Sequence, residues 1–171
     1  MYHDRVKRSY AVLFVLVIAA CGGRPSFPQS TESPLLGKPL PEIKHRSTLD
    51  GAPFDPSVNA GKPVLVKFFA EYCKPCVETL PAAERVHQAH PEVVFLGIDE
   101  DDSPDTARTM VKRYNLTFPV IHDRENILSG RFRVATMPAT FVTDASGVVR
   151  WVGAENQTEK DIERAVSAAR P

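Results

Sequence analysis

Cys73 and Cys76 form a Cys-Lys-Pro-Cys motif between an apolar run and a segment with helical periodicity. Two thiols at this spacing on a first helical turn can close a disulfide with little movement of the backbone. The free amides and dipole of a helix N-terminus favour a thiolate, and Lys74 adds a positive charge. We therefore expect the pKa of the Cys73 thiol to lie below its ordinary value of about 8.5. Cys76, one turn further along, would be shielded and would resolve a mixed disulfide on Cys73, so the motif predicts redox exchange.

A structural disulfide and half of a zinc site are the simpler interpretations of this pair. A ring closed across two residues constrains the unfolded chain too little to stabilise the fold much. Zinc usually takes four ligands, and the five histidines offer no second ligand pair, because they are scattered and His3 lies close to the N-terminus. We predict no metal and no cofactor. A copper carrier, with Met137 or His122 as a third ligand, is the alternative from another functional class.

The residues around the motif predict strands that alternate with helices. Before it, residues 64–69 (VLVKFF) are typical of a central strand buried on both faces. After it, apolar positions three and four residues apart predict a helix over 74–90. The remaining patterns predict a hairpin or extended segment at 43–49 before the turn Asp50-Gly51, strands at 93–98, 118–121, 140–143 and 148–152, and helices at 103–115, 127–132 and 158–169. This order predicts an α/β sandwich whose sheet is part parallel and part antiparallel.

Length and charge limit the classes of function. The chain has 171 residues, of which 43% are apolar, so it suits one well-buried domain and is too short for two typical ones. Lys plus Arg and Asp plus Glu are equal at 21 each, so the formal net charge is zero. A neutral chain creates no long-range field to gather nucleic acid, and we predict no nucleic-acid partner.

The N-terminus has the features of an export signal. Arg5, Lys7 and Arg8 precede an uninterrupted apolar run at 11–20. This run is about half of the ~20 residues that a membrane-spanning helix needs, so residues 1–20 are predicted to be a signal peptide. The following residues, rich in Gly, Pro and Ser, predict a flexible tether over 21–34 and a folded domain over 35–171.

The end of the signal resembles a bacterial lipobox. Small residues in Ile18-Ala19-Ala20 precede Cys21, which such proteins acylate on sulfur and expose as the new N-terminus. This resemblance implies a lipid-anchored protein that faces the periplasm from the inner or the outer membrane. The alternative is a plain signal peptide cut after Ala20, which would leave Cys21 as a free thiol.

The stretch VLVKFFAEYCKPCVETLP resembles the active-site segment of thioredoxin-fold proteins, in particular the TlpA/ResA-like exported thiol-disulfide oxidoreductases. Leu80-Pro81 matches the Leu-Pro that follows the second cysteine in that family. The similarity runs from about residue 36 to residue 165. It implies a thioredoxin-like sandwich with an N-terminal extension and a βα insertion before a cis-proline loop. It also implies a monomer without a cofactor that acts on exported protein thiols and disulfides and receives electrons from a membrane donor.

The same resemblance implies a substrate-binding set around the cysteines. Pro138 matches the family's cis-proline, which exposes the backbone of the preceding residue, Met137, for strand-like pairing with a substrate. Met137 could instead fill the core. Tyr72 stands where the family usually has Trp and still provides a flat apolar rim. Lys74 and Pro75, between the cysteines, complete the set.

Lys67 departs from the family pattern. Six residues before the first cysteine, thioredoxins carry a buried acid thought to help deprotonate the second thiol, and TlpA-like proteins often have Asn. A charged lysine cannot accept that proton. We expect Lys67 either to extend to solvent or to stabilise a thiolate, which would make the protein a weaker reductant. Glu71 and Glu78 are the alternative proton acceptors.

The motif alone leaves the direction of electron flow open, because oxidants, isomerases and reductants share it. The resemblance implies a reducing role, in cytochrome c maturation or on periplasmic disulfides. A peroxiredoxin-like peroxidase is a further alternative. The Pro-x-x-x-Thr-x-x-Cys context of such enzymes is absent, because Phe69 to Tyr72 precede Cys73 without Pro or Thr.

Overall fold

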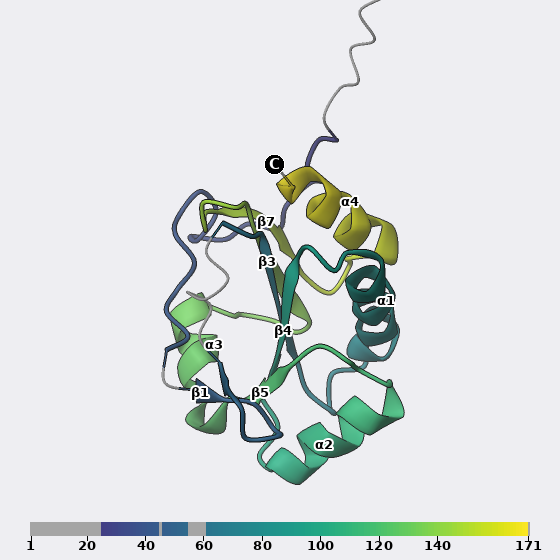
Figure 1. Ribbon diagram of the computed structural model, residues 1–171. Coiled ribbons are helices and arrows are strands. Elements are labelled where there is room, and N and C mark those ends of the chain that lie inside the picture. The colour runs from purple at the N-terminus through teal and green to yellow at the C-terminus, as the bar shows by residue number, and fades with distance from the viewer. Residues whose placement is uncertain (1–24, 45, 55–60, 171) are drawn as a thin grey trace, which may run out of the picture.

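The computed structural model describes residues 25–44, 46–54 and 61–170. A central five-stranded sheet has the strand order β5-β4-β3-β6-β7, with helices on both faces (Figure 1). The elements are β1 (Arg46–Ser47), β2 (Pro53–Phe54), β3 (Val64–Phe69), α1 (Cys76–Ala89), β4 (Val94–Asp99), α2 (Pro104–Arg113), β5 (Val120–His122), α3 (Ile127–Phe132), β6 (Ala139–Thr143), β7 (Val149–Gly153) and α4 (Glu159–Ala169). The predicted signal peptide and Cys21 lie outside the described residues.

The sheet is mixed, as the sequence predicts. β3 lies at its centre, parallel to β4 and antiparallel to β6, so Lys67 faces Gly97 on one side and Thr140 on the other. β5 extends the parallel half, and β7 extends the antiparallel half through a hairpin with β6. The short β1 and β2 form the predicted hairpin at Asp50-Gly51. The α/β sandwich with a strand and helix, β5 and α3, before the β6 hairpin is therefore confirmed.

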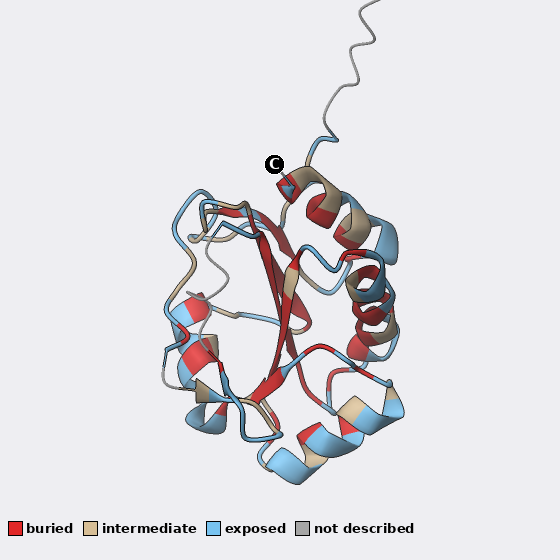
Figure 2. Cartoon of the chain, viewed as in Figure 1, coloured by how far each residue is buried: buried red, intermediate tan, exposed pale blue. Residues whose placement is uncertain are grey.

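Side chains that alternate along β3 divide the core into two layers. Leu65 and Phe69 pack in the layer under α1 and α4, together with Trp151 of β7. Val66 and Phe68 pack in the opposite layer under α3. All six residues of β3 are buried, as expected for a strand covered on both faces (Figure 2). This alternation also places the side chain of residue 67 on the face covered by α1.

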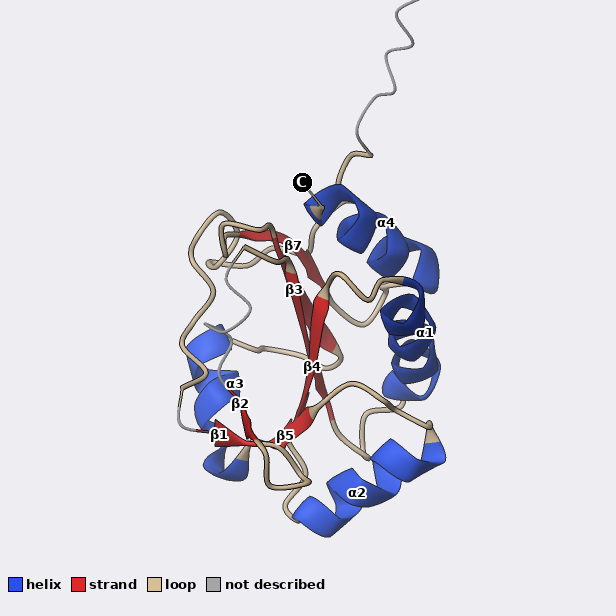
Figure 3. Ribbon diagram, viewed as in Figure 1, coloured by secondary structure: helices blue, strands red, loops and turns tan. Residues whose placement is uncertain are grey.

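Figure 3 shows the helices, and two of them, α2 and α4, start at local sequence signals. The Ser103 side chain accepts a hydrogen bond from the Asp105 amide, and Pro104 occupies the first helical position of α2. Thr158 and Asp161 form a capping box at the start of α4. Among the described residues, no helix is both long and apolar enough to cross a bilayer.

The described part of the predicted tether packs on the domain, which corrects the boundary expected at residue 35. The amide of Thr31 donates to the carbonyl of Val152 at 2.7 Å, and the indole of Trp151 donates to the carbonyl of Gln29 at 3.2 Å. Phe27 packs against the core layer under α1 and α4. Composition suggested flexibility, but the segment finds backbone partners on β7 that lie more than a hundred residues away along the chain.

Candidate redox site

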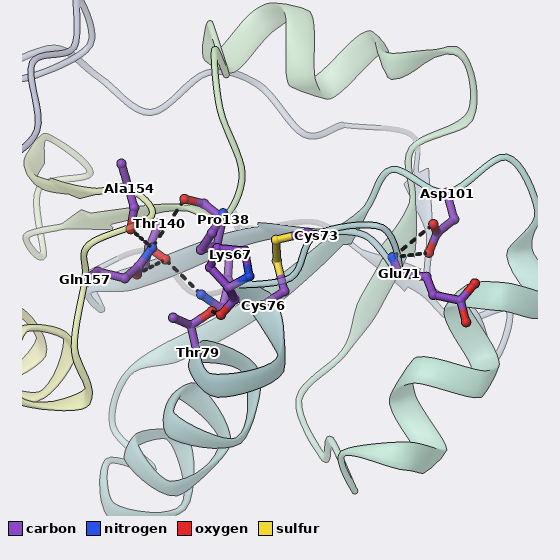
Figure 4. The surroundings of a disulfide bond; sticks show 11 residues. Lys67, Glu71, Cys73, Cys76, Thr79, Asp101, Pro138, Thr140, Ala154 and Gln157 are labelled. Atoms are coloured by element: carbon purple, nitrogen blue, oxygen red, sulfur yellow. Dashed lines mark hydrogen bonds between the residues drawn. A yellow bond between two sulfur atoms is a disulfide. The ribbon is translucent and has the colours of Figure 1, made fainter.

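The two cysteines lie at the junction between β3 and α1. The chain turns after Phe69, and the Cys73 amide donates to the Ala70 carbonyl at 3.1 Å. The spacing predicted that both cysteines lie on the first turn of a helix. In the structure α1 begins at Cys76, so Cys73 lies in the turn just before the helix. The Cys73 and Cys76 sulfurs are 2.03 Å apart and form a disulfide, with the Cα atoms 5.3 Å apart (Figure 4). The redox pair is therefore closed in this structure.

The two sulfur-bearing residues differ in access. Cys73 is 5% exposed, whereas Cys76 is completely buried beneath it. A thiol arriving from solvent can reach only the residue that retains some exposure. The division between an attacking and a resolving cysteine stays a prediction, and this difference in exposure is consistent with it.

A groove of about 530 Å³ lies beside Cys73. It brings together four of the five residues predicted to bind substrate, with Pro138 buried behind them. The Met137-Pro138 peptide bond is cis, as the resemblance implies. The groove is lined by Tyr72, Cys73, Lys74, Pro75, Glu100, Val134, Ala135, Thr136, Met137 and Glu155.

Tyr72 and Met137 lie in the groove lining. Tyr72 is 68% exposed and lines the groove, and its role as an apolar rim for substrates stays a prediction. Met137 is half-buried, lines the groove and also packs against both core layers. The two interpretations of Met137 are thus compatible, because one side of the residue fills the core while another borders the groove.

Lys67 is wholly buried, which contradicts the expectation that it extends to solvent. Its strand is paired on both edges and covered by α1, so the side chain has no route to water. The ammonium Nζ donates to Thr140 Oγ1 at 3.3 Å, and Thr140 Oγ1 donates to Gln157 Oε1 at 2.6 Å. Burial lowers the pKa of Lys67 to about 7. Near neutral pH this lysine can therefore be charged or neutral.

The chain of hydrogen bonds continues from Lys67 to the cis-proline loop (Figure 4). Gln157 Nε2 donates to the carbonyl of Ala154 at 2.8 Å and to that of Pro138 at 3.4 Å. A single buried network thus connects the lysine on β3 with the backbone that follows Met137. The sequence offered no signal for it, because its members lie on three separate elements.

The predicted alternative proton acceptors lie on the surface. Glu71 is exposed, and its carboxylate lies 3.7 Å from the Arg113 guanidinium. Glu78 is also exposed, on the first turn of α1. Glu71 and Glu78 are thus exposed, whereas Lys67 is buried on the face of the sheet that α1 covers.

Residues 36–152, more than half of the chain, match the model of the AhpC/TSA family. The chain belongs to this family. It is 27% identical over 113 residues to the thiol-disulfide oxidoreductase ResA of Geobacillus kaustophilus, and this match covers 65% of each chain. It is 29% identical over 132 residues to the thioredoxin-like protein YneN of Bacillus subtilis, covering 75% of this chain and 76% of YneN.

A solved structure of the same fold is that of a secreted disulfide oxidoreductase from Mycobacterium tuberculosis. The two chains share 28% identity with a TM-score of 0.66, and the match covers 72% of this chain and 93% of the other. The thioredoxin-like fold and the resemblance to ResA-like proteins are therefore confirmed.

This AhpC/TSA-family chain also has a buried acidic cluster that sequence reasoning missed. Both oxygens of the Asp101 carboxylate accept from the Glu71 amide at 3.0 Å, which ties the turn before Cys73 to the end of β4. Asp99 Oδ2 accepts from the Asp101 amide at 3.3 Å and lies 3.0 Å from His122 Nδ1. Burial, with a further contribution from Asp101, raises the pKa of Asp99 to about 8. The only signal in the sequence was the run of four acids at residues 99–102, directly after the strand predicted at 93–98.

The position of His122 bears on the copper alternative. His122 is hydrogen-bonded to Asp99 and is absent from the groove lining. Within the described ranges, no group of three or more His, Cys, Asp or Glu side chains is arranged to hold a metal ion. No described contact therefore brings His122 to the cysteines as a third ligand.

Replacing Asp101 tests whether it holds the turn. We expect Asp101→Ala to lower the free energy of unfolding of the oxidised protein by about 1–3 kcal/mol, because the Glu71 amide loses both of its acceptors. Urea unfolding measures this change. Asp102→Ala is the matched control, since Asp102 is exposed, and it should alter stability by less than about 0.5 kcal/mol. Equal effects of the two variants would contradict the assignment.

Proposed function

We propose that the protein is a thiol-disulfide oxidoreductase that exchanges the Cys73–Cys76 dithiol and disulfide with exported protein substrates. The observation that carries this proposal is the disulfide at the edge of a groove, with one cysteine partly accessible and the other fully buried. The names of the related proteins support the same activity. The reaction needs no cofactor, because the two sulfurs carry both electrons.

In the reducing direction, the Cys73 thiolate attacks one sulfur of a substrate disulfide. The Cys73–substrate bond forms as the substrate disulfide breaks, and the substrate's other sulfur leaves as a thiolate that takes up a proton. Cys76, once deprotonated, then attacks the Cys73 sulfur. The mixed disulfide breaks, the second substrate sulfur leaves, and the Cys73–Cys76 disulfide forms. The substrate gains two electrons and two protons, and the protein loses two electrons.

The groove supports binding of an extended peptide. Among the described residues, none forms a hydrogen bond with the backbone of Met137, so its amide and carbonyl are available for strand-like pairing. Tyr72, Lys74 and Pro75 line the groove from the side of the cysteine turn. Pro138 fixes the loop that presents Met137.

Export and anchoring complete the proposal. The predicted signal and the lipobox at Cys21 support a protein tethered by lipid to a bacterial membrane, inner or outer, with the domain in the periplasm. Relatives named as secreted proteins support a location outside the cytoplasm. There the domain would act as a monomer and as a reductant that receives electrons from a membrane donor.

Insulin reduction tests the activity. The protein purified under reducing conditions should accelerate the reduction of insulin disulfides by dithiothreitol by roughly tenfold or more, because the attacking thiolate is preformed. Metal content should be measured on the same sample. Stoichiometric copper together with negligible insulin reduction would overturn the proposal in favour of a carrier.

A further inference from the structure

The groove beside Cys73 is acidic on balance. Its lining includes two carboxylates, Glu100 and Glu155, and one cation, Lys74. Glu155 is exposed on the turn after β7, whereas Glu100 is half-buried at the end of β4. The chain as a whole is neutral, so this local excess of negative charge is a property of the groove rather than of the protein.

The backbone of Glu100 is fixed by a hydrogen bond, but one oxygen of its carboxylate has no hydrogen-bond partner among the described residues. Its amide donates to the Phe69 carbonyl at 3.0 Å, which fixes the backbone beside the turn that leads to Cys73. Its carboxylate interacts with Ser129, yet Oε1 is shielded from solvent without a hydrogen-bond partner among the described residues. Burial and the nearby Asp123 raise the pKa of Glu100, which indicates that the ionised carboxylate lacks compensation. Glu100 also lines the groove, so a cation bound there would lie beside this residue.

We propose that Glu100, assisted by Glu155, selects substrates that carry a lysine or arginine side chain next to the reactive cysteine. This inference rests on the proposed function and adds the chemical class of its substrate. A cation in the groove would supply a donor to the Glu100 carboxylate, in a partly buried site where charge-assisted hydrogen bonds are strong. An acidic substrate residue would instead meet two carboxylates, and Lys74 alone would attract it.

Matched peptides separate this selectivity from the basic activity. Three disulfide-bridged peptides would differ only at the residue beside the reactive cysteine, which would be Lys, Gln or Glu. The rate constant for their reduction by the reduced protein is measured at pH 7 and low salt. We expect the Lys peptide to react about tenfold faster than the Glu peptide, with the Gln peptide between them, and 0.5 M NaCl to reduce the ratio.

The variants assign the preference to particular carboxylates. Glu100→Gln and Glu155→Gln should each narrow the Lys-to-Glu ratio, and the double variant should bring it below about threefold. Glu32→Gln changes an exposed carboxylate that is absent from the groove lining, and it should leave the ratio unchanged. Because Glu155 is exposed, its variant tests the idea even if Glu100→Gln impairs folding.

Other outcomes are equally decisive. Equal rates for the Lys and Glu peptides, a faster Glu peptide, or a ratio that survives both substitutions would overturn the charge preference while leaving the oxidoreductase activity standing. Failure to reduce any peptide, including the Gln peptide, would instead contradict the proposed function itself.

Discussion

Cys76→Ser is expected to accumulate as a mixed disulfide with its substrates, whereas Cys73→Ser is expected to form none. The partly exposed Cys73 can attack a substrate, but without the buried Cys76 no second thiolate is present to release the product. Both substitutions should lower turnover in the insulin assay by roughly 10³-fold or more, because the two sulfurs act as a unit. Non-reducing electrophoresis after acid quenching of cells, followed by mass spectrometry, detects the adducts.

Two controls make the trapping result specific. The double variant Cys73→Ser/Cys76→Ser should yield no adducts, and added dithiothreitol should dissolve those of Cys76→Ser. The rate of alkylation of Cys73 in the reduced protein should remain appreciable below pH 8, since Cys73 lies just before the N-terminus of α1, whose dipole favours its thiolate. Adducts on Cys76 instead, or alkylation of Cys73 like that of an ordinary thiol, would exclude the proposed roles.

Lys67→Met is expected to stabilise the oxidised protein below pH 7. The pKa of Lys67 is about 7 in the folded protein and 10.5 in the unfolded chain, so the fold bears the cost of a buried charge at low pH. This difference corresponds to at most about 5 kcal/mol, of which we expect a few kcal/mol to appear. Thr140 retains its bond to Gln157, so the substitution leaves no unpaired hydroxyl.

The pH dependence gives the sign of this effect. Between pH 7 and 10.5 the unfolded chain binds a proton that folded Lys67 has lost, so wild-type stability rises with pH in this window. The advantage of Lys67→Met should therefore shrink by about 1.4 kcal/mol per pH unit above pH 7. Urea unfolding at pH 6 and pH 9 measures it. Lys62→Met, at an exposed lysine just before β3, should show neither the stabilisation nor its pH dependence.

The same substitution tests the effect of the charge on the redox pair. We expect a charged Lys67 on the α1 face to stabilise the thiolate of the reduced form, so its removal should make the reduction potential more negative. About 30 mV corresponds to each 1.4 kcal/mol of thiolate stabilisation. Lys67→Asn should act in the same direction, and equilibration with glutathione measures both variants. An unchanged or more positive potential would remove this role from Lys67.

Much of the architecture is predictable because it depends on neighbours along the chain. The central strand at 64–69 and the helix starts at Ser103 and Thr158 depend on short stretches of sequence. The structure places each of them within a residue or two of its predicted position. The cis-proline at Pro138 followed from the resemblance to a family rather than from local pattern. The start of α1 was placed two residues early, since turn and helix have similar local signals at the cysteines.

The amino-acid sequence alone determined the redox pair and the order of strands and helices, and the family resemblance added Tyr72, Lys74, Pro75 and Met137 among the residues that line the groove. Tertiary structure alone decided the burial of Lys67, the hydrogen bond from the Glu71 amide to Asp101 and the packing of residues 27–31 beside β7. The physical reason is the range of the interactions. Helix caps and strand periodicity involve residues a few positions apart, whereas burial and buried hydrogen bonds depend on elements that meet only when the whole chain has folded.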